Sequence, residues 1–139
     1  MKKCVLARMS SVFLLCFALS LSFAGAAIAD SSLDETIDAL ITLFEAKDYR
    51  AIVLEYSHPD AIIKMEQPDV ADRQEARQEA IEKLIALQER FGGMTLKRLT
   101  EAKEMKPEYL NDGRDALFNF GGGYYLRFRK NFSGKWCLL

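Results

Sequence analysis

Apolar residues recur at helical spacing soon after residue 32 and predict a first helix. Ser32 and Glu35 form a Ser-x-x-Glu capping box, a signature of helix N-termini. The predicted helix begins at this box and ends near Lys47. Its buried stripe would consist of Leu33, Ile37, Leu40 and Phe44.

Two further helices are predicted before residue 92. Asp48 can cap a short second helix that stops by His58, because the residue before Pro59 disfavours the α conformation. An apolar turn follows at residues 61–65, and a long third helix is predicted over Val70–Phe91, where Gly92-Gly93 would end it. The stripe of this third helix would be Ala80, Leu84, Leu87 and Phe91.

The periodicity changes after Gly93 and predicts strands. Residues 94–106 alternate imperfectly, and turn-forming residues follow them. Three more strand-like runs come next, so the pattern predicts a four-stranded antiparallel meander. The later runs are Asp115–Phe120, Tyr124–Lys130 and Trp136–Leu139.

The register of the central hairpin follows from its glycine turn. If Phe120 pairs with Tyr124 across Gly121-Gly122-Gly123, one face becomes almost wholly apolar. The opposite face then carries the oppositely charged pair Asp115 and Arg129. The last hairpin stays open: a loop of two or four residues puts Trp136 on the arginine face and Cys137 on the Phe128 face, and a loop of three residues reverses them.

Residues 1–29 have the pattern of a cleaved signal peptide. A basic start is followed by an apolar run and by the small residues Ala27 and Ala29, the A-x-A pattern that signal peptidase requires. A retained membrane anchor is the alternative, but the apolar run is shorter than such a span needs. We therefore expect a single domain over residues 30–139, periplasmic or secreted, with no stable membrane span after cleavage.

Charge and cysteine content narrow the partners. The chain has 19 basic and 20 acidic residues, and loss of Lys2, Lys3 and Arg8 with the leader leaves a net charge of −4. An acidic, exported domain is a poor candidate for nucleic-acid binding. Only Cys137 remains after cleavage, so no disulfide can form within the mature chain, and a buried role is expected for this thiol.

The order of elements resembles the nuclear transport factor 2-like superfamily, also called cystatin-like α+β cones. The resemblance covers the mature chain and includes residues 44–49, residues 124–130 and the terminal Gly134-Lys135-Trp136. It implies a twisted antiparallel sheet curled around a long helix, with an apolar pocket at the mouth of the cone. Within the superfamily it points to a SnoaL-like or uncharacterised exported branch. Members of the superfamily include small-molecule binders, isomerases, dehydratases, cyclases and non-catalytic partners, and many of them dimerise through the sheet.

The resemblance also directs attention to His58, the only histidine. Enzymes of this superfamily often place an Asp–His pair inside the cone, and histidine is the natural general base near neutral pH. However, His-Pro-Asp is also ordinary loop chemistry. The residues predict no metal site, because a lone histidine lacks the further ligands that a metal requires, and they predict no cofactor. The triple glycine lacks the context of a phosphate-binding loop and is expected to be a turn.

Aromatic residues on one predicted sheet face provide a binding hypothesis. Most of them must be core, but the mouth of a cone leaves part of such a face open. Tyr124 is the first candidate, because its hydroxyl could orient a ligand. The candidate ligand-binding residues are Tyr124, Phe118, Phe120 and Phe128.

The other sheet face carries the basic excess of the C-terminal part. Residues 92–139 have a net charge of +4, whereas residues 30–91 have −8. Arg127 and Arg129 could form an interaction face for an acidic partner, a second subunit or an anionic envelope component. An ordinary solvated sheet surface is the alternative.

The sequence thus favours an exported, non-catalytic domain that binds a small apolar molecule or a protein partner. One alternative is a small isomerase or hydrolyase that uses His58 with a carboxylate. The other is a dimeric module that associates through the arginine face.

Overall fold

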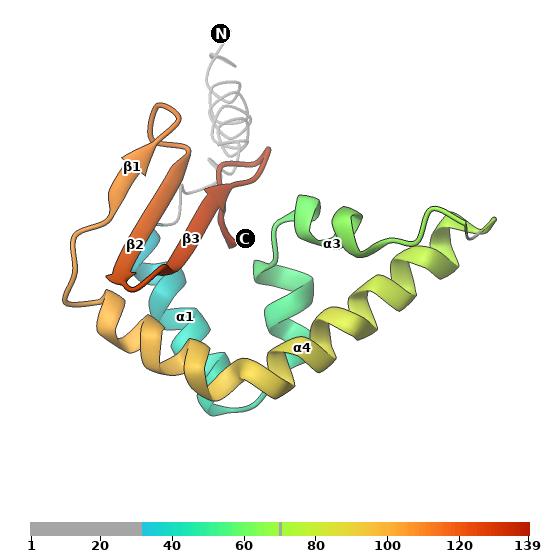
Figure 1. Ribbon diagram of the computed structural model, residues 1–139, viewed down its shortest axis with the longest axis horizontal. Coiled ribbons are helices and arrows are strands. Elements are labelled where there is room, and N and C mark those ends of the chain that lie inside the picture. The colour runs from blue at the N-terminus through green and yellow to red at the C-terminus, as the bar shows by residue number, and fades with distance from the viewer. Residues whose placement is uncertain (1–31, 70) are drawn as a thin grey trace, which may run out of the picture.

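The chain forms an α+β structure in which helices precede a four-stranded antiparallel open sheet (Figure 1). It is known from a computed structural model that describes residues 32–69 and 71–139. The predicted leader, residues 1–29, lies outside the described residues. Among the described residues, no helix has the length and apolarity needed to cross a membrane.

The first helical elements lie where the pattern predicts them. Helix α1 spans Leu33–Glu45, and the capping box between Ser32 and Glu35 is present in both directions. Asp48 caps α2, Tyr49–Ala51, which continues as the π-helix η1, Ile52–Tyr56. The chain then turns at His58 as expected.

The expected turn at residues 61–65 is instead part of a helix. Helix α3 spans Pro59–Met65 and has proline at its first position, where no backbone N–H is needed. The His58 side chain caps it by accepting a hydrogen bond from the backbone N–H of Asp60.

Helix α4 is the longest element and corrects two predictions. It spans Arg73–Ala102, beginning at the capping residue Asp72, so both the predicted stop at Gly92-Gly93 and the strand expected at residues 94–106 are wrong. Each glycine costs a helix about 1 kcal/mol relative to alanine, but packing outweighs that cost here. Gly92 is buried beside the ring of Tyr49, and Leu99 is fully buried one turn before the end.

The four strands form a meander in sequence order. The first strand is β1, Glu108–Leu110, and the others are β2, Asp115–Gly121, β3, Tyr124–Lys130, and β4, Trp136–Leu138. The predicted register of β2 and β3 is confirmed from Asp115 opposite Arg129 to Asn119 opposite Tyr125.

The end of the central hairpin differs from the prediction. Gly121, and not Phe120, pairs with Tyr124, because an irregularity follows Asn119. Gly122 and Gly123 both have positive φ, as a tight two-residue hairpin turn requires.

The last hairpin has a loop of five residues, 131–135, and its faces are those that the sequence analysis gave for a loop of three residues. Trp136 pairs with Lys130, and Cys137 pairs with Arg129. Cys137 therefore lies on the arginine face, and Trp136 lies on the same face as Phe128. The Asn131 carboxamide orders the connecting loop, because its oxygen accepts hydrogen bonds from Ser133 and from the Lys135 backbone.

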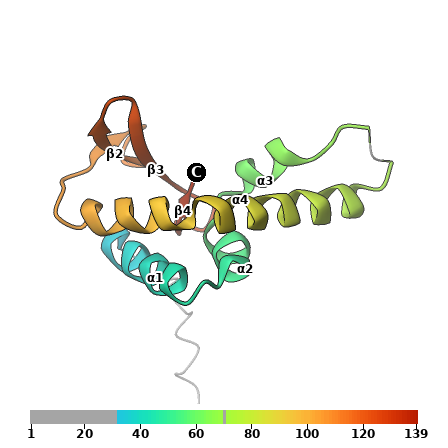
Figure 2. The same ribbon diagram turned by 60° about the horizontal axis from the view of Figure 1, so that its bottom comes forward.

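Two groups of buried apolar residues hold the elements together. The larger group joins α1, η1 and the last turns of α4 to the apolar face of the sheet, and the smaller group joins η1, α3 and the first half of α4. The resemblance implies a sheet curled around the long helix. In the structure the last turns of α4 pack on the sheet, whereas Ala80, Ile81 and Leu84 in its first half pack with α3 and η1. Figures 1 and 2 show α4 running along the molecule, with the sheet near one end and α3 near the other.

The two adjacent glycines of α4 provide a matched test of this packing. An alanine Cβ at Gly93 meets no atom within 4 Å, whereas one at Gly92 lies 2.9 Å from Cε1 of Tyr49. We expect Gly93→Ala to raise the free energy of unfolding by about 0.5–1 kcal/mol through helix propensity. Gly92→Ala should show no such gain, because the Tyr49 ring must move. Urea unfolding followed by circular dichroism measures both, and an equal gain in the two variants would contradict the packing of Tyr49 on α4.

Candidate functional site

Asp115, the first residue of β2, is a carboxylate with no exposed surface. A tight turn precedes it, in which Asn111, Asp112 and Gly113 all have positive φ. The turn brings Nδ2 of Asn111 to 2.8 Å from Oδ2 of Asp115, to which it donates a hydrogen bond. The turn thus positions the neutral Asn111 side chain to donate to the buried Asp115 carboxylate.

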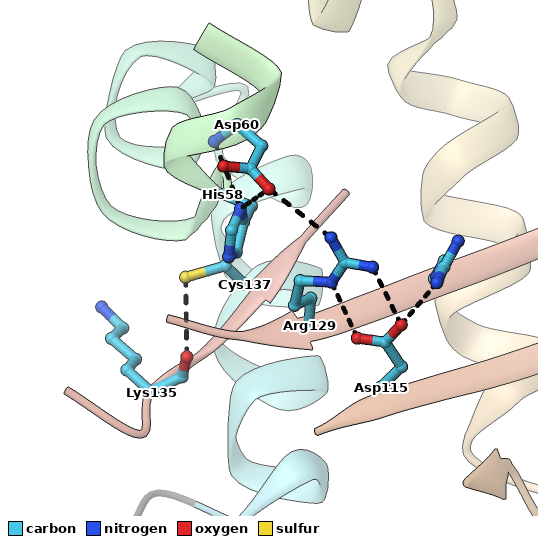
Figure 3. A network of polar contacts seen from close by, with 7 residues as sticks. His58, Asp60, Asp115, Arg129, Lys135 and Cys137 are labelled. Atoms are coloured by element: carbon cyan, nitrogen blue, oxygen red, sulfur yellow. Dashed lines mark hydrogen bonds and ion pairs between the residues drawn. The ribbon is translucent and has the colours of Figure 1, made fainter. Parts of the chain in front are cut away.

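Two arginines of β3 supply the remaining donors. Alternation along the strand puts Arg127 and Arg129 on the same face, and the register sets Arg129 opposite Asp115. Arg129 donates from Nε to Oδ1 at 2.8 Å and from Nη2 to Oδ2 at 3.0 Å, and Nη2 of Arg127 also donates to Oδ2 (Figure 3). A buried charge is stable only when it is paired and hydrogen-bonded in this way.

These contacts set the protonation state of Asp115. The hydrogen bonds from Arg129, and then those from Arg127 and Asn111, hold the pKa of the carboxyl well below its usual range, although burial acts in the opposite direction. The same contact raises the pKa of Arg129. Asp115 and Arg129 therefore stay ionised at neutral pH, and together with Arg127 they form an ion cluster.

The start of α3 reaches this cluster from a distant part of the chain. Oδ2 of Asp60 lies 3.5 Å from Nη1 of Arg129 and also 3.5 Å from Nδ1 of His58. Figure 3 shows Asp60 lying between the histidine ring and the outer end of the guanidinium. The Asp60 side chain is 48% exposed, unlike that of Asp115.

His58 itself is buried and structurally engaged. Its backbone N–H donates to the carbonyl of Leu138 at 2.9 Å, and Nδ1 accepts the Asp60 backbone N–H at 3.2 Å. Because that acceptor role uses the lone pair of Nδ1, the neutral ring carries its proton on Nε2. Protonation of Nδ1 would exchange the helix cap for an ion pair with the Asp60 carboxylate.

Cys137 lies on the same face and is also buried. Its Sγ donates to the Lys135 carbonyl at 3.7 Å, and burial raises the pKa of the thiol. A raised pKa disfavours the thiolate, which is the reactive form. Cys137 therefore has the properties of a structural residue.

A pocket of about 600 Å³ opens over this end of the sheet. Its size falls within the range of small-molecule sites, about 300–1,000 Å³. Seven of its ten lining residues have charged or amide side chains, in contrast to the apolar cavity that the sequence predicts. The lining residues are His58, Asp60, Asn111, Arg114, Asp115, Arg129, Lys130, Asn131, Phe132 and Gly134.

The predicted aromatic residues lie elsewhere, and none lines this pocket. Phe118 and Phe128 are 1% and 0% exposed and pack edge to face within the core. Phe120 is half-buried and Tyr124 is 59% exposed, and the guanidinium of Arg98 lies over both rings. The predicted set is therefore divided between core and surface.

The predicted interaction residues are partly engaged within the chain. Arg127 and Arg129 keep about a third of their side-chain surface, but both bind Asp115. Across the described ranges, no group of three or more His, Cys, Asp or Glu side chains is arranged to hold a metal ion.

Comparisons with models of known protein families, with curated proteins and with solved structures found no match.

Of the pocket residues, only His58 and Arg129 were among the sequence-based site candidates. Asp60, Asn111 and Arg114 are three of those that were missed. Only Asn111 has a local signal, since Asn-Asp-Gly predicts the turn that precedes Asp115. Asp60 lies 69 positions from Arg129, so no local pattern could have joined the two.

Replacement of Asp115 tests the buried cluster. Asp115→Asn should lower the free energy of unfolding by about 3 kcal/mol at neutral pH, because it leaves two arginines without their anion. Because the folded-state pKa is depressed, the stabilisation by the wild-type carboxylate is complete above the unfolded-state pKa near 4 and is lost as the pH falls below it. The difference in free energy of unfolding between wild type and Asp115→Asn should therefore become smaller below pH 4.

Asp112→Asn is the matched control, since this exposed carboxylate lies in the adjacent turn. It should change stability by no more than about 0.5 kcal/mol. Urea unfolding between pH 3 and pH 7 measures the free energy of unfolding of wild type, Asp115→Asn and Asp112→Asn. A gap between wild type and Asp115→Asn that does not depend on pH would contradict the assigned pKa direction.

Proposed function

We propose that the mature chain is a non-catalytic binding domain whose ligand occupies the pocket over Asp115 and Arg129. The observation that carries this proposal is a pocket of suitable volume whose charged side chains are held in place by a buried ion cluster. Fixed donors favour binding because less conformational entropy is lost when a ligand arrives.

The lining favours a small polar ligand over an apolar one. Phe132 is the only apolar side chain among the lining residues, and the other members are polar, charged or glycine. An apolar ligand at Phe118 or Phe128 has less support, because both side chains are already enclosed by protein. Tyr124 remains accessible and keeps the apolar-ligand proposal open at the hairpin end of the sheet.

Export, the cone-shaped fold and the relation to nuclear transport factor 2-like proteins also belong to this proposal. They rest on the leader pattern of residues 1–29 and on the order of elements. The helix-then-meander order supports the relation. A sheet that packs on α1 and the end of α4, with α3 on the other half of α4, gives the cone less support.

A catalytic role for His58 is the second candidate, because the pocket brings the imidazole and the Asp60 carboxylate together. The hydrogen bond that the Asp60 backbone N–H donates to Nδ1 argues against a catalytic role. Because Nδ1 already accepts this hydrogen bond, the neutral ring has no free lone pair with which to act as a general base. The geometry therefore favours His58 as a helix cap.

A dimer or an acidic partner held by Arg127 and Arg129 is the third candidate. Both arginines would have to keep their contacts with Asp115 while they bind the partner. Arg129→Glu, an obvious interface variant, would place a carboxylate against Asp115 and destabilise the monomer. A test of dimerisation therefore needs a different residue, such as the exposed Tyr125 on the same sheet face.

Nuclear magnetic resonance titration tests the binding proposal. Amino acids, neutral sugars and octanol serve as probes at millimolar concentration. We expect at least one polar probe to shift the backbone amide signals of Arg114 and Gly134, which both line the pocket. Arg114→Ala should weaken this response, whereas Arg77→Ala, an exposed arginine on α4, should not.

Two results would count against the proposal. One is a response to octanol alone with shifts centred on Tyr124, which would return the site to the hairpin end of the sheet. The other is no response to any probe.

A further inference from the structure

We infer that the pocket takes an oxyanion, a carboxylate or phosphate group of a small molecule, and that Asp60 occupies the position of this group until the ligand displaces it. The inference rests on the proposed binding function and adds the chemistry of the ligand. It depends on how the charges around Arg129 are paired.

The two sides of the Arg129 guanidinium are held very differently. Nε and Nη2 bind the buried Asp115 carboxylate at 2.8 and 3.0 Å. Among residues 32–69 and 71–139, Nη1 has one carboxylate partner, the half-exposed Asp60 at 3.5 Å. Exposed ion pairs of this length contribute little to stability, so the outer side of Arg129 can exchange partners at small cost.

The charged residues of the lining are Asp60, Asp115, Arg114, Arg129 and Lys130. Arg129 binds both carboxylates, and Arg127, which lies outside the lining, also binds Asp115. Lys130 lies over the Trp136 ring. The exposed Arg114 side chain makes no ion pair within the part of the chain that the structure describes, so its charge is available to a ligand.

An oxyanion satisfies this arrangement. Guanidinium groups bind carboxylate and phosphate through paired N–H donors, and such charge-assisted bonds are stronger than neutral ones. An anion between Arg114 and Nη1 of Arg129 would take the position that Asp60 now holds. Asp60 can withdraw without loss of the helix cap, since His58 accepts from its backbone N–H and not from its side chain.

Isothermal titration calorimetry at constant ionic strength tests this inference, with sodium succinate and inorganic phosphate as separate probes. Arg114→Ala should weaken binding about tenfold, as expected for loss of one charge-assisted contact. Asp60→Asn should strengthen binding about threefold or more, because the internal competitor is gone. If only one of the two probes binds, its identity shows whether the site takes a carboxylate or a phosphate.

Matched controls separate the site from a general charge effect. Glu45→Gln makes the same charge change as Asp60→Asn on the exposed end of α1, and Arg77→Ala matches Arg114→Ala. Neither control should change affinity by more than about twofold. Asp60→Ala serves as a second variant, and circular dichroism confirms that each variant is folded.

Three outcomes would overturn the inference in different ways. If a neutral sugar shifts the pocket signals but neither anion binds, the assignment of the ligand as an oxyanion is wrong, while the proposed binding function stands. If no probe binds at all, both proposals fail. If an anion binds but Asp60→Asn binds it no more tightly than Glu45→Gln does, Asp60 is not its competitor.

Discussion

The pairing of one buried carboxylate with two arginines is the constraint on which the rest of this structure depends. Asp115 has no exposed surface, and an unpaired charge there would be too costly to bury. Asn111, Arg127 and Arg129 remove that cost, and in doing so they join the turn before β2 to β3. The sheet register and the ion cluster therefore specify one another, since a slip by one residue would separate Asp115 from Arg129.

The same cluster links the sheet to the helices beside it. Arg129 extends to Asp60 at the start of α3, and His58 bonds to Leu138 at the end of the sheet. The pocket forms where these elements meet. Because the side chains that line it belong partly to the cluster, the geometry that stabilises the fold also orients the donors that a ligand would use.

Local patterns in the sequence predict those parts of the fold that depend on interactions between residues close together in the chain. The capping box at Ser32 and the alternation of β2 and β3 predict α1 and the central register, because each depends on neighbouring residues. Gly92 predicts a helix end that does not occur, because its burial beside Tyr49 and the burial of Leu99 outweigh its cost to the helix. Those contacts are tertiary, so no window of sequence contains them.

The candidate site was predictable only in part for the same reason. The pairing of Asp115 with Arg129 follows from the register that the sequence predicts, but the burial of Asp115 and the approach of Asp60 depend on the packing of α3.

The buried pairing of Asp115 with Arg129 is tested most directly by the Arg129 Nε–H signal in a nitrogen-15 spectrum, which is assigned by its loss in Arg129→Lys. A buried bond to Asp115 predicts a signal that exchanges slowly with water at neutral pH, and a signal that exchanges as fast as that of exposed Arg77 would contradict the account.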